Sequence, residues 1–185
     1  PFHIIDKYLC EEDQDLFFST DGPSEVHDQI RTGKNGAGSY SVLQQKIEYY
    51  RERYEKNNKG FSSSTVLTAK DGDFAHILLH LDHLGFEYIV MRPIRGSRET
   101  DFGLNERTLP IFLDGYKSLI DLIETRAMEG DINILYKVCN RYDFYGRLFS
   151  AMILGEKRVQ GCPGCPPIHT DIARYSLVFD TVGNV

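Results

Sequence analysis

Residues 61–93, FSSSTVLTAKDGDFAHILLHLDHLGFEYIVMRP, decide the fold of this chain. The run at 61–69 is rich in β-branched residues and predicts a strand, and the apolar run at 86–91 predicts another. Between them, a helix is expected to begin after Asp71-Gly72-Asp73 and to end at Gly85. A strand, a helix and a strand in this order indicate a βαβ unit with parallel strands. The helix should bury an apolar stripe made of Phe74, Ile77, Leu78, Leu81 and Leu84.

The residues before this unit predict one more strand and one more helix. Residues 16–20 form a short apolar run that indicates a buried strand, closed by Asp21-Gly22-Pro23. The polar residues 24–37 predict a loop, and loops of that length are often functional. Ser39 is expected to cap the helix that follows. The apolar stripe of that helix is Tyr40, Leu43, Ile47, Tyr50 and Tyr54.

The residues after the unit continue with a polar loop at 94–108 and a helix that Pro110 opens. A further helix is expected from about residue 134 to 154, and a last strand at 176–179. The stripe of the helix after Pro110 is Phe112, Tyr116, Leu119, Ile120 and Ile123.

Together these elements predict an α/β fold, an incomplete parallel (β/α) barrel with an exposed edge at the 16–20 strand. Ligands of parallel sheets bind at the carboxyl ends of the strands. The loops after Thr20, Ala69 and Met91 should therefore share one edge of the sheet, which is the default site.

Composition excludes several classes of protein. The chain has 185 residues, of which 41% are hydrophobic and 26% charged, as in an ordinary soluble domain. Its formal charge of −6 argues against general nucleic-acid binding, which needs clustered cations. No apolar run approaches the length of a membrane helix. Four unevenly spaced cysteines are too few for a disulfide scaffold and favour reduced thiols in the cytoplasm.

Two further stretches carry a resemblance to a known family. Residues 18–31 read FSTDGPSEVHDQIR, and residues 36–40 read GAGSY. This pattern resembles the middle of radical S-adenosylmethionine (radical SAM) enzymes of the SPASM class, such as the anaerobic sulfatase maturases, which modify peptides and proteins. Downstream, GCPGC at 161–165 and SLVFD at 176–180 resemble the start of that class's auxiliary-cluster domain.

The resemblance implies a division of the chain. Residues 1–108 would be the C-terminal part of the radical SAM partial barrel, about strands four to six. Residues 109–158 would be a helical connection, and 159–185 the start of a truncated auxiliary iron–sulfur cluster domain. The C-x-x-x-C-x-x-C motif that holds the family's first cluster is absent from these 185 residues. We therefore expect an internal fragment that is inactive alone.

The resemblance also implies cofactors and partners. These are S-adenosyl-L-methionine, a 4Fe-4S cluster in the full-length protein, a peptide or protein substrate and an electron donor. Ser19 matches the family serine that holds the amino-acid end of S-adenosylmethionine. Asp21 is a second candidate, although a carboxylate at this position is also typical of a turn.

Ser62 and Ser64 lie two residues apart on a predicted strand, so they face the same side. Inside a barrel that side would be the polar lumen, beside the cofactor. On an edge strand the same hydroxyls would face water.

Cys162 and Cys165 are the candidate metal ligands. Their C-x-x-C lies in a Pro- and Gly-containing stretch, where two thiolates suit a metal. The resemblance makes one or both of them ligands of an auxiliary iron–sulfur cluster. Half a zinc knuckle, a redox pair and an incidental loop remain alternatives.

The three histidines at 76, 80 and 83 share one helix face, opposite the apolar stripe, and are expected to point to solvent. The function predicted for the parent protein is peptide or protein maturation by S-adenosylmethionine cleavage and hydrogen abstraction. The alternative is a non-catalytic α/β module that binds a peptide at an exposed strand edge.

Overall fold

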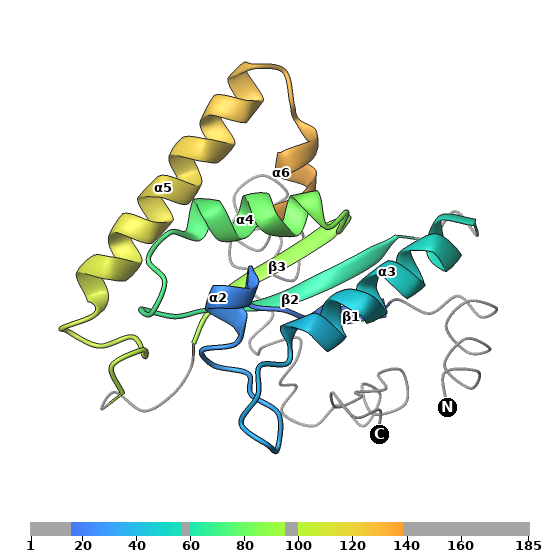
Figure 1. Cartoon of the computed structure of the whole chain (residues 1–185). Helices are drawn as coiled ribbons and strands as arrows, with labels where there is room; N and C mark the ends of the chain where they lie inside the picture. Colours follow the sequence, from blue (N-terminus) through green and yellow to red (C-terminus); the bar gives the residue numbers. More distant parts are fainter. Residues whose placement is uncertain (1–15, 57–59, 95–99, 139–185) are drawn as a thin grey trace, which may run out of the picture.

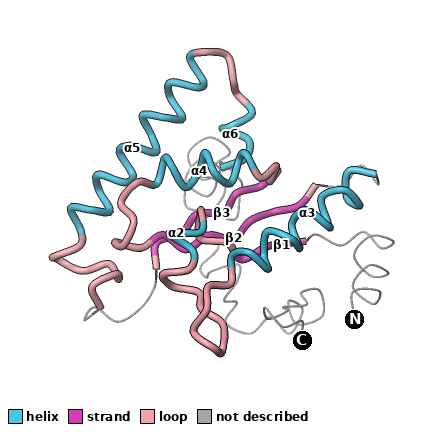
Figure 2. The backbone as a smooth tube through the Cα atoms, in the orientation of Figure 1, coloured by secondary structure: helices cyan, strands magenta, loops and turns pink. Residues whose placement is uncertain are grey.

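A three-stranded parallel sheet with helical crossovers forms the centre of the molecule (Figure 1). The computed structural model describes residues 16–56, 60–94 and 100–138. The strands are β1 (Leu16–Ser19), β2 (Phe61–Leu67) and β3 (Tyr88–Pro93), in the order β1-β2-β3. Helix α3 (Tyr40–Lys56) connects β1 to β2, and α4 (Phe74–His83) connects β2 to β3 (Figure 2). The predicted α/β class with parallel strands is confirmed, and β1 is one of the two edge strands of the described sheet, with β3 as the other.

Three further helices complete the described part of the chain. Helix α2 (Ser24–His27) is a single turn after β1, α5 (Leu109–Met128) packs against α4, and α6 (Asn133–Val138) packs against β3 and α5 (Figure 1). None of the helices in the described ranges is long and apolar enough to cross a membrane.

The hydrophobic core lies between the sheet and the helices α3 and α4. The predicted stripe of α4 is buried throughout, because all five of its apolar residues are at most 9% exposed. Asp73 caps this helix through its side chain, which accepts a hydrogen bond from the His76 backbone N–H at 3.0 Å. The sheet contributes the residues that point toward the helices, among them Phe18, Phe61, Leu67, Ile89 and Met91.

Three predictions about the elements are corrected by the structure, and a fourth falls largely outside the described residues. The residues predicted as a loop at 24–37 include the short helix α2. Strand β3 begins two residues later than predicted and includes Arg92 and Pro93, because it pairs with β2 as far as Leu67. In α5, Ile120 is 41% exposed and lies outside the buried stripe. The described part of the last predicted long helix is α6, and its remainder lies outside the described residues, as does the strand at 176–179.

Candidate functional site

The register of the sheet brings the three predicted serines to one face. Ser19 on β1 pairs with Ser64 on β2, and Ser62 pairs with Phe17. Paired residues on neighbouring parallel strands point to the same side, as do residues two apart on one strand. Ser19 is exposed, Ser64 is half-buried and Ser62 is 4% exposed. The expected common face is therefore present, while the binding role of these hydroxyls stays a prediction.

The same face carries two further features. Ser62 lies between Phe17 and Tyr88, which are 48% and 50% exposed, so an open aromatic pair flanks this serine. Nearer the carboxyl ends, Val66 pairs with Arg92. We call the carboxyl ends of the three strands, with the residues that follow each of them, the rim. The face thus changes from aromatic to hydroxyl-bearing to cationic as it approaches the rim.

Asp21 is the buried anchor of the rim. Its side chain is 1% exposed and forms a two-point ion pair with Arg31, at 2.5 Å to Nε and 3.2 Å to Nη2. The same carboxylate accepts a hydrogen bond from the Val66 backbone N–H at 3.0 Å. Beyond Ser19 the carboxylate takes the place of a main-chain acceptor, and so continues the pairing between the end of β1 and β2. Both carboxylate oxygens therefore already have protein partners.

His27 closes the loop that follows Asp21. The imidazole is 1% exposed. Its Nδ1 accepts a hydrogen bond from the Asp21 backbone N–H at 3.2 Å, and its Nε2 lies 3.0 Å from the Ser39 hydroxyl. That hydroxyl donates to the Arg31 carbonyl at 2.9 Å. The beginning, middle and end of the 21–39 loop are therefore joined through one side chain.

The helix cap predicted for Ser39 is supplied by another residue. Ser39 precedes α3 as expected, but its hydroxyl bonds to the loop rather than to the helix. The Asp28 carboxylate accepts from the Tyr40 backbone N–H at 2.8 Å instead. The carboxyl group of Asp28 packs directly on Gly38, where an added Cβ would lie 2.2 Å from it. Glycine at 38 is therefore required by this close approach.

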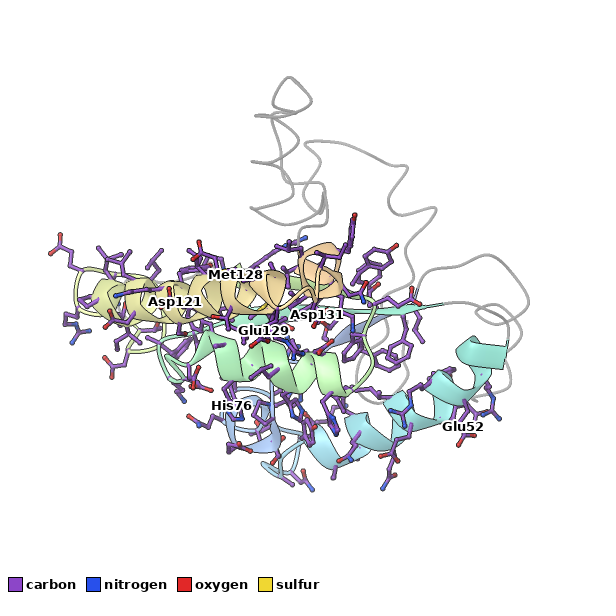
Figure 3. The ribbon with its side chains drawn as sticks, turned by 90° about the horizontal axis from the view of Figure 1, so that it is seen from above. Glu52, His76, Asp121, Met128, Glu129 and Asp131 are labelled. Atoms are coloured by element: carbon purple, nitrogen blue, oxygen red, sulfur yellow. The ribbon has the colours of Figure 1, made fainter. Side chains whose placement is uncertain are left out.

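The histidines of α4 do not all point to solvent as predicted. His76 and His83 are exposed, but His80 is half-buried and its Nε2 lies 2.7 Å from the Tyr40 hydroxyl of α3 (Figure 3 labels His76). Burial lowers the pKa of His80 and raises that of Tyr40. Within the described residues, no group of three or more histidine, cysteine and acidic side chains could hold a metal ion.

A groove of about 450 Å³ lies at the opposite end of the sheet, near the amino end of β3. Lys137 pairs with Asp82 at 2.5 Å, and Arg126 pairs with Asp131 at 3.3 Å. Three carboxylates line this groove, and two of them, Asp82 and Asp131, form these ion pairs. The lining residues are Asp82, Glu87, Tyr88, Asp131, Asn133, Ile134, Tyr136 and Lys137.

Sequence reasoning did not single out Arg31 or His27. Both residues belong to the FSTDGPSEVHDQIR stretch at 18–31. A histidine and an arginine four residues apart in a polar loop were the feature of the sequence that could have indicated them. The candidate metal ligands Cys162 and Cys165 lie outside the described residues.

Solved structures of one enzyme share the fold of this chain. No protein-family model matches the chain, and no curated protein matches it. Native anSMEcpe, an anaerobic sulfatase-maturing enzyme with bound AdoMet (S-adenosylmethionine) and Kp18Cys peptide, matches with a TM-score of 0.63 and 18% identity over 84% of this chain. The chain carries part of the radical SAM fold. The match covers 41% of that structure's chain, so this chain spans about two fifths of its length.

Two related structures agree on the radical SAM fold. The same enzyme with AdoMet and Cp18Cys peptide matches at 18% identity, and its hexahistidine-tagged form with AdoMet matches at 19%. Both have TM-scores of 0.63 and are covered over 41% and 39% of their chains. The resemblance seen in the sequence is confirmed at the level of the fold.

Proposed function

We propose that this chain is part of a radical SAM enzyme that modifies a peptide or protein side chain, and that it forms one wall of the S-adenosylmethionine site. One observation carries the proposal. Ser19 and Ser64 form a hydroxyl-bearing row near the carboxyl ends of parallel strands, in a fold shared with structures that bind AdoMet. Ligands of parallel sheets bind at this end.

The side chains fit the amino-acid end of S-adenosylmethionine. That end carries a carboxylate and an ammonium group, and a serine hydroxyl can donate to the first or accept from the second. Ser19 is exposed and can reach a ligand, Ser64 is partly accessible and Ser62 lies deeper. Asp21 has both oxygens bonded within the protein, so we propose that it supports the site by holding the loop.

In this proposal the chain binds and orients, because its described residues bring hydroxyls and charges to one face. When bound, S-adenosylmethionine supplies the radical chemistry that removes a hydrogen atom from the substrate. The hydroxyls of Ser19 and Ser64 hold its amino-acid end, and the Asp21–Arg31 pair fixes the neighbouring loop. Cytoplasmic location, a peptide or protein substrate and an electron donor belong to the same proposal.

Replacing Ser19 by alanine tests the site. Hydrogen bonds to charged groups contribute about 1.5–3 kcal/mol, so Ser19→Ala should weaken S-adenosylmethionine binding about tenfold or more. Ser41→Ala is the matched control, because Ser41 is exposed on α3 and should leave the affinity unchanged. The measurement is calorimetric titration of the chain. Equal affinity in the Ser19 and Ser41 variants would remove Ser19 from the site.

Cys162 and Cys165 are proposed as ligands of an auxiliary 4Fe-4S cluster. The cluster binds through thiolates, so Cys162→Ala and Cys165→Ala should each lower the iron content of the full translated protein after anaerobic reconstitution with iron and sulfide. Cys139→Ala is the control. Cys139 follows the apolar residues Ile134, Leu135 and Val138, a pattern that predicts a core position, so this variant should keep its iron. Unchanged iron in both variants would show that the C-x-x-C is an incidental loop feature.

A second candidate function rests on the edge position of β1. Within the described sheet, the side of β1 that faces away from β2 could add a peptide strand without any cofactor. This module would bind a peptide equally well with and without S-adenosylmethionine and would be indifferent to Ser19→Ala. The radical SAM proposal expects Ser19→Ala to weaken S-adenosylmethionine binding.

A further inference from the structure

The 21–39 loop is tied together by a buried chain of hydrogen bonds. The chain runs from the Asp21 backbone N–H to His27, from His27 to the Ser39 hydroxyl, and from there to the Arg31 carbonyl. Ser39 is 7% exposed and His27 is 1% exposed, so water does not compete for these bonds. Each link joins residues that are six or more positions apart.

These partners fix the tautomer of His27. A backbone N–H only donates, so Nδ1 must carry its lone pair and no hydrogen. The Ser39 hydroxyl spends its single hydrogen on the Arg31 carbonyl, so it can only accept from His27. Nε2 therefore carries the hydrogen. Both ring nitrogens are satisfied only in the neutral Nε2–H form.

Charged and polar groups from three elements surround this ring. Asp21, Asp28 and Arg31 belong to the loop itself, and the Tyr40 ring of α3 lies edge-on at 5.7 Å between ring centroids. His80 of α4 contacts the same tyrosine from its far side. Burial lowers the pKa of His27 and outweighs the opposing pull of the Asp21 and Asp28 carboxylates, while Arg31 acts in the same direction as burial.

We propose that His27 is a pH-sensitive positioning residue: its neutral Nε2–H form holds the 21–39 loop closed beside Ser19, and protonation at Nδ1 releases it. A hydrogen on Nδ1 would face the Asp21 backbone N–H, and two donors cannot bond to each other. The Asp21 backbone must then move or lose its partner. Asp21 lies two residues after Ser19, where β1 ends, so the change acts on the rim. The inference rests on these contacts and goes beyond the proposed cofactor binding.

The sign of the pH effect follows from the lowered pKa. The open loop exposes His27 and lets it bind a proton near its ordinary pKa of about 6.5, whereas the closed loop binds that proton only at lower pH. The closed form of the loop is therefore fully favoured above the ordinary pKa of His27. It loses stability as the pH falls from there toward the lower pKa that His27 has in the closed loop.

Amide hydrogen exchange of the full chain tests this inference. The readout is the protection of the Asp21 N–H, its exchange rate relative to that of an unstructured peptide at the same pH. Protection should fall severalfold between about pH 7.5 and about pH 5, because the open loop takes up a proton that the closed loop does not accept in this range. In His27→Asn, which keeps an acceptor but cannot titrate, protection should no longer depend on pH. His83→Asn, at an exposed position of α4, should respond as the unaltered protein does.

Two results of the exchange experiment would overturn the inference. One is equal protection at both pH values in the unaltered chain, and the other is the same pH response in His27→Asn. The imidazole tautomer, read by nuclear magnetic resonance in the unaltered protein, needs no variant to fold, and an Nδ1–H tautomer would also contradict it. None of these readouts involves S-adenosylmethionine, so failure of the proposed cofactor site would leave their interpretation intact.

Discussion

Asp21→Ala is expected to lower the free energy of unfolding by about 3 kcal/mol. The substitution removes the two-point pair with Arg31 and leaves the Val66 N–H without its acceptor. Breaking a buried ion pair costs about 3–5 kcal/mol, and we take the lower end because the Arg31 side chain is 34% exposed and can be hydrated. Urea unfolding followed by circular dichroism measures the change.

Two further substitutions make this test specific. Asp21→Asn keeps a hydrogen-bond acceptor for Val66 but loses the charge, so its loss of stability should be smaller than that of the alanine variant. Asp101→Ala breaks the pair with Arg107, whose side chains are 90% and 72% exposed, and should not change the midpoint measurably. An Asp21→Ala protein as stable as Asp101→Ala would refute the anchoring role.

Gly115→Ala is expected to destabilise the protein by about 2 kcal/mol, although alanine is the better helix former by about 1 kcal/mol. Gly115 lies inside α5 where the helix crosses the start of α4. An added Cβ would lie 2.7 Å from the Gly72 carbonyl oxygen and 2.7 Å from the buried ring of Phe74. Neither neighbour can move easily, because one is backbone and the other is fully buried.

Lys117→Ala is the control on the same helix, since Lys117 is exposed and the change should be close to neutral or slightly stabilising. Thermal unfolding of both variants gives the comparison. A Gly115→Ala protein that melts at or above the unaltered one would mean that α5 and α4 are not packed this closely.

The successes of sequence reasoning lie where local signals agree. In α4 the apolar spacing, the Asp73 cap and the Gly85 stop all indicate the same helix, and the structure has it. The parallel direction of β1 and β2 follows from consecutive strands that are joined by a helix. Such features depend on neighbours within a few residues, so a single sequence is enough to predict them.

The failures involve partners that are distant in the chain. The cap of α3 comes from Asp28, twelve residues before Tyr40, and no periodicity signals a carboxylate at that separation. His80 is half-buried and contacts Tyr40, which belongs to another helix and lies forty residues away in the chain. Ile120 belongs to the apolar stripe predicted for α5, yet its side chain is exposed.

The candidate site was predicted in part for the same reason. Strand alternation predicted that the hydroxyls of Ser62 and Ser64 lie on one face. It could not show that the Asp21 carboxylate is already bonded to Arg31 and to the Val66 backbone N–H. That outcome depends on how the loop folds back, which is a tertiary effect. The buried position of His27 has the same origin, because it needs the two ends of the loop to meet.

Titration of the isotope-labelled chain with S-adenosylmethionine, followed at each backbone amide, tests the central claim most directly. The account predicts that the shifts gather at the rim, at Ser19, Ser64 and the 21–39 loop, because those residues surround the proposed wall of the site. Shifts confined to Asp82, Glu87 and Lys137 in the groove at the other end of the sheet, or no shifts at all, would contradict it.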